Sequence, residues 1–137
     1  MWFNNMKIEE HEESLKQHKE AIFEWALEVK GIENSQRIIG LHASRAALDL
    51  LCIYLIKTKR STPGIQLNHR WFKKLDVGQK LPHFPNKVTI LKKMNQLELM
   101  CENLSYGAKR NKKSILEVVG LLKEIEDKLV KQIEKEK

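Results

Sequence analysis

The fold is decided by residues 37–60, RIIGLHASRAALDLLCIYLIKTKR. When this stretch is wound as a helix, it is apolar on most of its circumference, and a helix of that kind is buried on nearly every side. Asn34 or Ser35 can cap its start, and we expect it to run to about Arg60. The stretch therefore predicts a helix at the centre of a larger helical domain.

Apolar residues recur at helical spacing on both sides of this central helix. Before it, a first helix ends at Gly31, a residue typical of helix ends. After it, a third long helix begins near Pro85 and ends at Tyr106-Gly107. Ser114–Glu117 has the pattern of a capping box, so a fourth helix starts there or slightly earlier. The three apolar stripes are Ile8, His11, Leu15, His18, Ile22, Trp25 and Val29; Ile90, Met94, Leu97, Cys101 and Leu104; and Ile115, Val118, Leu122, Ile125, Leu129 and Ile133.

Between the second and third long helices, the sequence changes character. Ser61–Gly64 is a turn signal, residues 68–75 form a short helix capped by Asn68, and Pro82 and Pro85 bracket a second break. No segment alternates polar and apolar residues as a strand does. We predict a single all-α domain over residues 1–137, an antiparallel four-helix up-and-down bundle with an additional short helix between the second and third long helices.

Positive charge is concentrated in the middle of the chain. The net charge is +7, yet residues 57–93 contain ten Lys and Arg residues and only one acidic residue, Asp76. A local excess of this kind favours polyanionic partners such as nucleic acid, although a solvated charged face gives the same pattern.

Several classes of protein are disfavoured by composition. The N-terminus, MWFNNMKIEEHEE, is acidic where an export signal is basic and then apolar, so we expect a cytoplasmic protein. Polar residues interrupt the apolar run of residues 38–56, so we predict no membrane association. Cys52 and Cys101 lie within apolar stripes and are expected to be core residues. We also predict neither a cofactor nor a metal.

Three polar residues share one face of the apolar helix. With about 100° per residue, His42 and Asp49 are offset by about 20°, and Arg45 lies within about 60° of both. One interpretation is that His42, Arg45 and Asp49 line an inter-helix cleft that binds a ligand. The alternative is a structural ion pair between Arg45 and Asp49, with His42 bonded to a neighbouring helix.

Two histidines of the first helix face the same interior. His11 and His18 are seven residues apart on one stripe, and with His42 they are candidate metal ligands. The sequence has no HExxH or ExxH pattern, and residues seven apart are separated by two helical turns. We therefore predict ordinary hydrogen bonds at a helix–helix interface for these histidines rather than a metal site.

The segment IQLNHRWFKKL, residues 65–75, interleaves aromatic and basic residues. That pattern suits stacking on bases and contact with phosphates. It equally describes a short amphipathic helix that packs Trp71, Phe72 and Leu75 on the bundle as a lid. The candidate nucleic-acid or anion surface consists of His69, Arg70, Lys73 and Lys74.

Two stretches resemble the HEPN superfamily. LHASRAALDLLCIYLIKTKRSTPGIQLNHRWFKKL, residues 41–75, is similar to the second helix of HEPN domains and the loop that follows it. LELMCENLSYGAKRNKKSILEVVGLLKEIEDKLV, residues 97–130, resembles their third helix, a break and the closing helix. The resemblance spans about residues 35–133 and is carried mainly by Leu, Ala, His and Tyr-Gly positions.

The resemblance implies a helical bundle that is usually a homodimer. It also implies RNA cleavage, nucleotide binding, or partnership with a nucleotidyltransferase protein in a toxin–antitoxin module. Active HEPN ribonucleases place Arg and His four to six residues apart near the start of the closing helix. Here Arg110 is followed by no His, and the one such spacing, Arg37 to His42, lies in the wrong helix.

These departures count against nuclease activity, so we assign no catalytic residue. The leading expectation is a non-catalytic, dimeric HEPN-like module that binds RNA, a nucleotide or a nucleotidyltransferase partner. One alternative is a ribonuclease with an unusual site, in which His42 or His69 is the general base. A second alternative is a purely structural subunit of an assembly.

Overall fold

The chain folds entirely into helices over the part that the structure describes. The structure is a computed structural model that describes residues 2–62 and 64–136, with side chains from residue 8 onward. No strand occurs within those ranges, so the all-α prediction and its four long helices are confirmed. The elements are α1 (Trp2–Lys19), the π-helix η1 (Glu20–Lys30), η2 (Ile32–Asn34), α2 (Gln36–Lys57), η3 (His69–Lys73), η4 (Leu75–Lys80), α3 (Lys87–Tyr106) and α4 (Lys112–Lys135).

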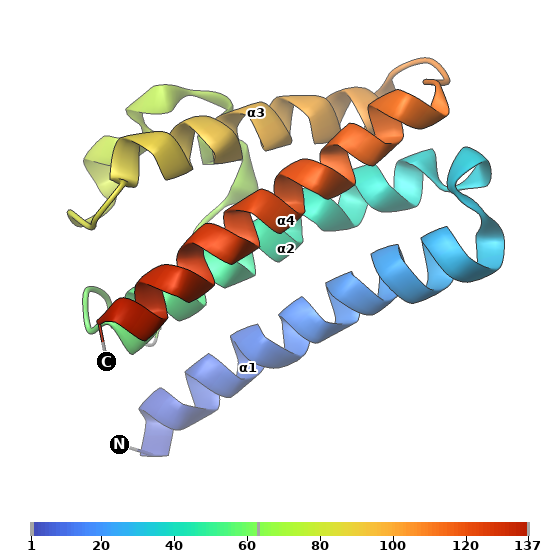
Figure 1. The fold of residues 1–137 in the computed structure, drawn as a ribbon. Helices are drawn as coiled ribbons and strands as arrows, with labels where there is room; N and C mark the ends of the chain where they lie inside the picture. Colours follow the sequence, from blue (N-terminus) through green and yellow to red (C-terminus); the bar gives the residue numbers. More distant parts are fainter. Residues whose placement is uncertain (1, 63, 137) are drawn as a thin grey trace.

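Helix α2 is the element on which the others pack. Figure 1 shows the chain reversing direction between successive long helices, so that both termini lie at the same end of the molecule. Helices α1, α3 and α4 all contact α2. By length and hydropathy α2 could cross a membrane, but 72% of its apolar window is buried inside the protein, as in the core helix of a soluble domain. The predicted central position of this stretch is confirmed.

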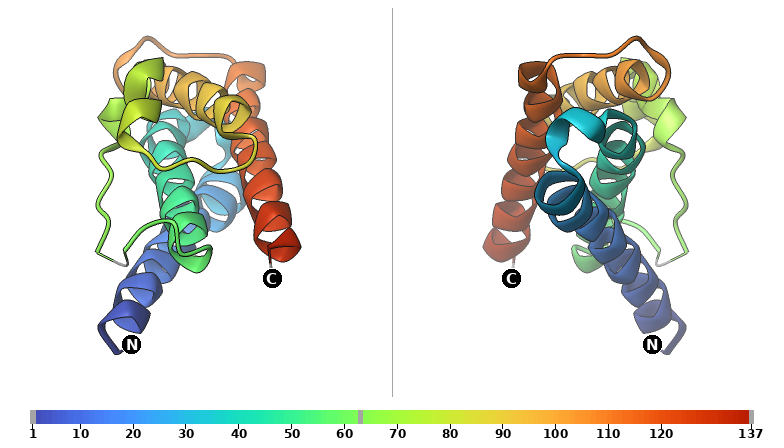
Figure 2. Two further views of the ribbon diagram at one scale, coloured as in Figure 1. Left: turned by 90° about the vertical axis from the view of Figure 1, so that its left-hand side faces the viewer. Right: turned by 90° about the vertical axis from the view of Figure 1, so that its right-hand side faces the viewer.

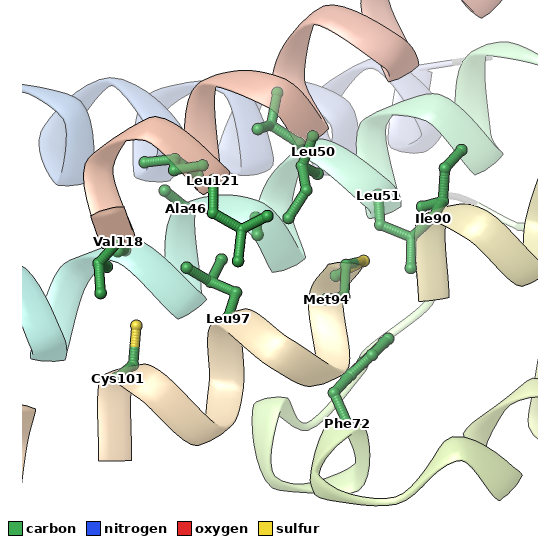
Figure 3. Close-up of a cluster of buried hydrophobic side chains, with 14 of the residues drawn as sticks. Ala46, Leu50, Leu51, Phe72, Ile90, Met94, Leu97, Cys101, Val118 and Leu121 are labelled. Atoms are coloured by element: carbon green, nitrogen blue, oxygen red, sulfur yellow. The ribbon is translucent and has the colours of Figure 1, made fainter. Parts of the chain in front are cut away.

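The core lies where α2, α3 and α4 meet. Figure 3 shows Met94 and Leu97 of α3 directed toward α2 and α4, with Phe72 of η3 packed beneath Met94. Leu51, Leu97 and Phe72 are at most 2% exposed. Because full burial of such a side chain stabilises a fold by about 1.5–3 kcal/mol, this contact fixes α3 and η3 against α2.

The stripe predicted for the first helix is wrong at its C-terminal end. Residues 20–30 form a π-helix, whose hydrogen bonds join residues five apart, so each turn holds more residues than an α-helical turn. Side chains three or seven residues after Ile22 therefore leave the common face. Ile22 is buried as predicted, and Ala26, four residues later, is buried with it, whereas Trp25 is 51% exposed and Val29 is 69% exposed.

The segment between α2 and α3 contains two short helices rather than the one predicted. The Asn68 cap is confirmed, because its side-chain oxygen accepts a hydrogen bond from the Arg70 amide at 2.9 Å. At Lys74 the backbone becomes extended, and this residue divides η3 from η4. The turn predicted at Ser61–Gly64 includes Pro63, which lies outside the described residues. Figure 2 shows η3 and η4 lying over α3, beside α2.

Two helix starts differ from the sequence expectation. Ser35 precedes α2, but its hydroxyl donates to the carbonyls of Ala26 and Gly31 instead of capping the helix. Helix α4 begins at Lys112, where the Asn111 side chain accepts a hydrogen bond from the Ser114 amide at 2.8 Å. Asn111 is therefore the cap, three residues before Ser114, the third position of the helix.

One glycine lets α2 and α3 approach closely. A Cβ added at Gly40 would lie 2.8 Å from both Leu104 Cβ and Ser105 Oγ. Such separations are shorter than van der Waals contact, so a side chain at this position would force the two helices apart. The two backbones therefore meet at this point, and a cleft that Gly40 helps to line opens beside it.

Candidate functional site

A solvent-open cleft lies between α2, α3 and η3. It has a volume of about 490 Å³, and both charged and apolar side chains line it. We call it the basic cleft because cationic residues dominate its charged lining. Its charged and imidazole side chains are Arg37, Arg45, His69, Arg70, Lys73, Glu98 and Glu102.

The centre of the basic cleft is a histidine held between a carboxylate and a guanidinium. His69 Nδ1 lies 2.7 Å from Glu98 Oε1, and His69 Nε2 lies 3.3 Å from Arg45 Nη2. An arginine nitrogen can only donate, so Nε2 is the acceptor, and the ring proton lies on Nδ1, from which it is donated to Glu98. Glu98 is only 4% exposed, which makes it a fixed and water-excluded partner.

The remaining cations reach the cleft from two elements. Arg37, near the start of α2, donates to the carbonyls of Ser105 and Gly107 at the end of α3. Lys73 of η3 forms an ion pair with Glu102 at 2.6 Å. Arg70 is exposed, and its guanidinium has no ion pair within the described residues. The cleft thus contains one unpaired cation and three cations with partners.

The sulfur of Cys101 borders the cleft but is not a nucleophile. Burial, followed by the nearby Glu98 carboxylate, raises the pKa of the Cys101 thiol to about 12. Burial likewise raises the pKa of Cys52 to about 12. The reactive species of a cysteine is the thiolate, so both thiols are inert near neutral pH. Both cysteines are buried, which confirms the prediction that they are core residues.

A second polar cluster lies on the opposite side of α2, between α2 and α1. We call it the histidine seam, and its members are His11, His18, His42 and Asp49. His11 Nδ1 is 3.1 Å from Asp49 Oδ1, and His18 Nδ1 is 2.9 Å from His42 Nδ1. His18 Nε2 also lies 3.7 Å from Asp49 Oδ2. The seam is therefore a chain of contacts that joins α1 to α2.

The histidine seam favours uncharged imidazoles. Burial lowers the pKa of His18, although the Asp49 carboxylate opposes this effect. Burial also lowers the pKa of His42, and the neighbouring His18 and Arg45 lower it further. The short contact between the two Nδ1 atoms requires one ring to donate and the other to accept, which two imidazolium rings cannot do.

Within the described residues, no group of three or more His, Cys, Asp or Glu side chains is arranged to hold a metal ion. Each histidine of the seam makes the kind of hydrogen bond expected at a helix–helix interface. The cluster is therefore built to fasten α1 to α2.

The structure separates the three polar residues that the helical wheel placed together. His42 and Asp49 belong to the histidine seam, whereas Arg45 bonds to His69 and to the Leu41 carbonyl on the other side. Helix α2 is buried on both flanks, so a residue offset by about 60° already faces a different neighbour. The expected Arg45–Asp49 ion pair is replaced by contacts of Asp49 with His11 and His18.

The predicted anion surface is brought together in part. His69, Arg70 and Lys73 all line the basic cleft. Lys74 is exposed on the surface and lies outside the cleft lining. Arg37 and His42, whose spacing resembles a nuclease motif, point to different helices.

Sequence reasoning missed Glu98, the residue that orients His69. A signal for it was present, because Glu98 lies four residues after Met94 and three before Cys101, on the buried stripe of α3. A carboxylate on such a face is seldom fully buried without a partner. That partner comes from η3, which is distant in sequence, so pattern alone does not identify it.

Comparisons of this chain with protein-family models, with curated proteins and with solved structures returned no match.

Proposed function

We propose that this chain is a non-catalytic HEPN-like helical module whose basic cleft binds the phosphate of a nucleotide, either free or within an RNA strand. The observation that carries the proposal is the convergence of Arg37, Arg45, Arg70 and Lys73 on one cleft that contains two carboxylates. Guanidinium groups match phosphate oxygens geometrically, and their charge attracts the anion.

The charge of the cleft supports an anionic ligand. Glu98 is hydrogen-bonded to His69, and Glu102 is paired with Lys73. Four cations against two carboxylates leave an excess of positive charge in a partly enclosed space. Since low-dielectric walls focus the electric field into a cleft, such an excess concentrates anions there.

The rim of the cleft supports a ligand that also carries a base. Tyr106 and Leu41 both line the cleft, and they are 82% and 45% exposed. An exposed aromatic ring next to cations is the arrangement on which bases stack in single-stranded nucleic-acid binding. A base stacked on Tyr106 would keep the adjoining phosphate within a cleft whose lining includes Arg70 and Lys73.

The helix order supports the family assignment. Four long helices that reverse direction in turn, with short helices between the second and third, fit an antiparallel four-helix up-and-down bundle (Figure 1). A homodimer, a nucleotidyltransferase partner and a cytoplasmic location follow from the proposed family and remain part of this proposal.

The proposal is tested by the anisotropy of a fluorescein-labelled single-stranded RNA at 50 mM salt. We expect Arg70→Ala with Lys73→Ala to weaken binding at least tenfold and to flatten the slope of log K against log salt by about 1.4, or about 0.7 per phosphate contact. Lys74→Ala with Lys92→Ala is the matched control, because it also removes two positive charges, from exposed residues outside the cleft lining. Equal losses from both variants, or no binding at low salt, would overturn the proposal.

A second candidate function rests on the His69–Glu98 hydrogen bond. A histidine oriented by a buried carboxylate can act as a general base through its other nitrogen. In this candidate, His69 Nε2 would accept the proton of an RNA 2′-hydroxyl once Arg45 has moved away. His42 is less suited to this role, because its Nδ1 is in contact with His18 in the seam.

This candidate is tested with labelled RNA in the presence of EDTA. Cleavage that His69→Ala abolishes and His42→Ala leaves intact would establish it. Intact RNA after prolonged incubation with wild-type protein would reject it and would leave the binding proposal in place.

A further inference from the structure

One nitrogen of the basic cleft has the wrong hydrogen-bonding polarity for an anion. In the structure without ligand, the lone pair of His69 Nε2 accepts a hydrogen bond from Arg45 Nη2 at 3.3 Å. A phosphate oxygen is also an acceptor, so it cannot bond to Nε2 in this state. An anion that reaches the centre of the cleft must therefore change the protonation of His69 or avoid it.

The carboxylate that His69 faces favours the first course. Its Nδ1 already donates to Glu98 Oε1 at 2.7 Å, and Glu98 is buried at 4% exposure. A carboxylate in that position stabilises an imidazolium, because it faces the positive charge at hydrogen-bond distance. Protonation of Nε2 turns it into a donor and at the same time ends its bond with Arg45, whose guanidinium is then free for the ligand.

The charged groups facing His69 come from three elements. Arg37 and Arg45 belong to α2, Glu98 and Glu102 to α3, and Arg70 and Lys73 to η3 itself. With His69 neutral, these six groups carry a net charge of about +2, and protonation of His69 raises it to about +3. A terminal phosphate monoester, with two negative charges, leaves about +1 of this charge uncompensated, whereas a phosphodiester, with one negative charge, leaves about +2.

We propose that the basic cleft takes the terminal phosphate monoester of a nucleotide, and that each molecule bound brings one proton onto His69 Nε2. This inference rests on the proposed function and adds the class of phosphate and the linkage to protons. The added proton comes from solvent, and the phosphate keeps both negative charges. Binding therefore weakens as pH rises, because each nucleotide bound takes up a proton.

The experiment is isothermal titration calorimetry of the full chain with AMP at pH 8 in Tris and in HEPES. The two buffers differ in ionisation enthalpy, so the difference in observed enthalpy counts the protons taken up. The phosphate of AMP is fully ionised at this pH, because its second ionisation lies near pH 6, and any uptake belongs to the protein. We expect uptake of about one proton in wild type.

Variants place that proton on a residue. His69→Gln keeps a donor toward Glu98 but cannot be protonated, so AMP binding should become independent of pH and buffer. His42→Gln, in the histidine seam, should retain the full uptake. Circular dichroism would check that both variants are folded.

The outcomes separate this inference from the proposed function. AMP binding without proton uptake, or uptake that persists in His69→Gln, overturns the inference alone. Binding of RNA or 3′,5′-cyclic AMP, a diester, with no binding of AMP also overturns it and leaves the proposed function intact. Absence of binding to AMP, cyclic AMP and RNA overturns both.

Discussion

Helix α2 has two polar flanks. The polar residues of one flank contact a neighbouring helix, and those of the other border an open cleft. On the α1 side, the residues of the histidine seam bond to one another: His42 contacts His18, and Asp49 Oδ1 contacts His11, while Asp49 Oδ2 is buried with no hydrogen-bond partner among the described residues. On the α3 side, Arg45 and His69 border a cleft of about 490 Å³ that is open to solvent. Polar residues that satisfy one another across a helix contact stabilise it, whereas polar residues that converge on an open space are available to a ligand. The comparison assigns structure to the seam and binding to the cleft.

The largest effect is expected where α2 and α3 touch at the edge of the cleft. Gly40→Ala places a Cβ 2.8 Å from Leu104 Cβ, so it should lower the free energy of unfolding by about 1–3 kcal/mol. Urea denaturation measures this change. Gly120→Ala is the control, because no atom lies within 4 Å of its added Cβ. In that helix interior, Ala should stabilise the fold by roughly 0.5–1 kcal/mol. Changes of the same sign in both variants would contradict the close approach at Gly40.

The next effect tests the two flanks directly. Asp49→Ala removes the acceptor of His11 and should destabilise the protein by about 1–2 kcal/mol without changing RNA affinity. Arg45→Ala should do the reverse, with RNA binding weakened about tenfold and stability nearly unchanged. Denaturation and anisotropy on both variants measure the two quantities. If Asp49→Ala weakened binding as much as Arg45→Ala, the two flanks would form one site.

A smaller effect is expected on the pH dependence of stability, to which the histidine seam contributes. The pKa values of His18 and His42 are lowered in the folded state, so the unfolded chain binds more protons than the folded one as pH falls below the ordinary value of 6.5. Stability is therefore complete above about pH 7 and declines as pH falls from 6.5 toward 5, before most carboxylates titrate. Urea midpoints at pH 7.5 and 5.5 measure the decline, which His42→Gln should reduce. A flat profile in wild type would contradict the assignment.

The smallest effect is an expected absence of reaction. With pKa values raised to about 12, Cys52 and Cys101 should resist a thiol-specific disulfide reagent at pH 7.5 while the protein is folded. Both should react within minutes in 6 M guanidinium chloride. Fast labelling of one thiol in the folded protein would show that its side of α2 opens readily.

The fold follows from sequence where one physical cause dominates. Burial of apolar surface determines the place of α2, and its all-round hydropathy predicts this directly. The phase of η1 was not predicted, because Trp25 and Val29 have helical spacing but lie in a π-helix whose turn is wider. The spacing of apolar residues indicates that a segment can form a helix. It does not show whether packing favours α-helical or π-helical hydrogen bonds.

The site is less predictable from sequence than the fold, because it also depends on how the helices pack. Basic and aromatic residues around His69 indicate an anion surface, and the cleft contains His69, Arg70 and Lys73. Its decisive contact, between His69 and Glu98, joins residues 29 apart and depends on how η3 packs on α3. A helical wheel gives angles about one axis, so it could not tell that Arg45 faces a different helix from His42.

The one-sided attachment of α1 has a consequence for local opening. From residue 8 to Lys19, this helix rests mainly on α2, with one ion pair to α4 between Lys19 and Glu126 at 2.8 Å. A groove of about 590 Å³ with an apolar floor separates it from α4. Elements with few buried neighbours open at lower cost than the whole protein unfolds, and their amides exchange hydrogen first. In amide exchange, α1 should therefore lose protection while α2 and α3 keep theirs. The histidine seam should then open under conditions in which the basic cleft is still formed.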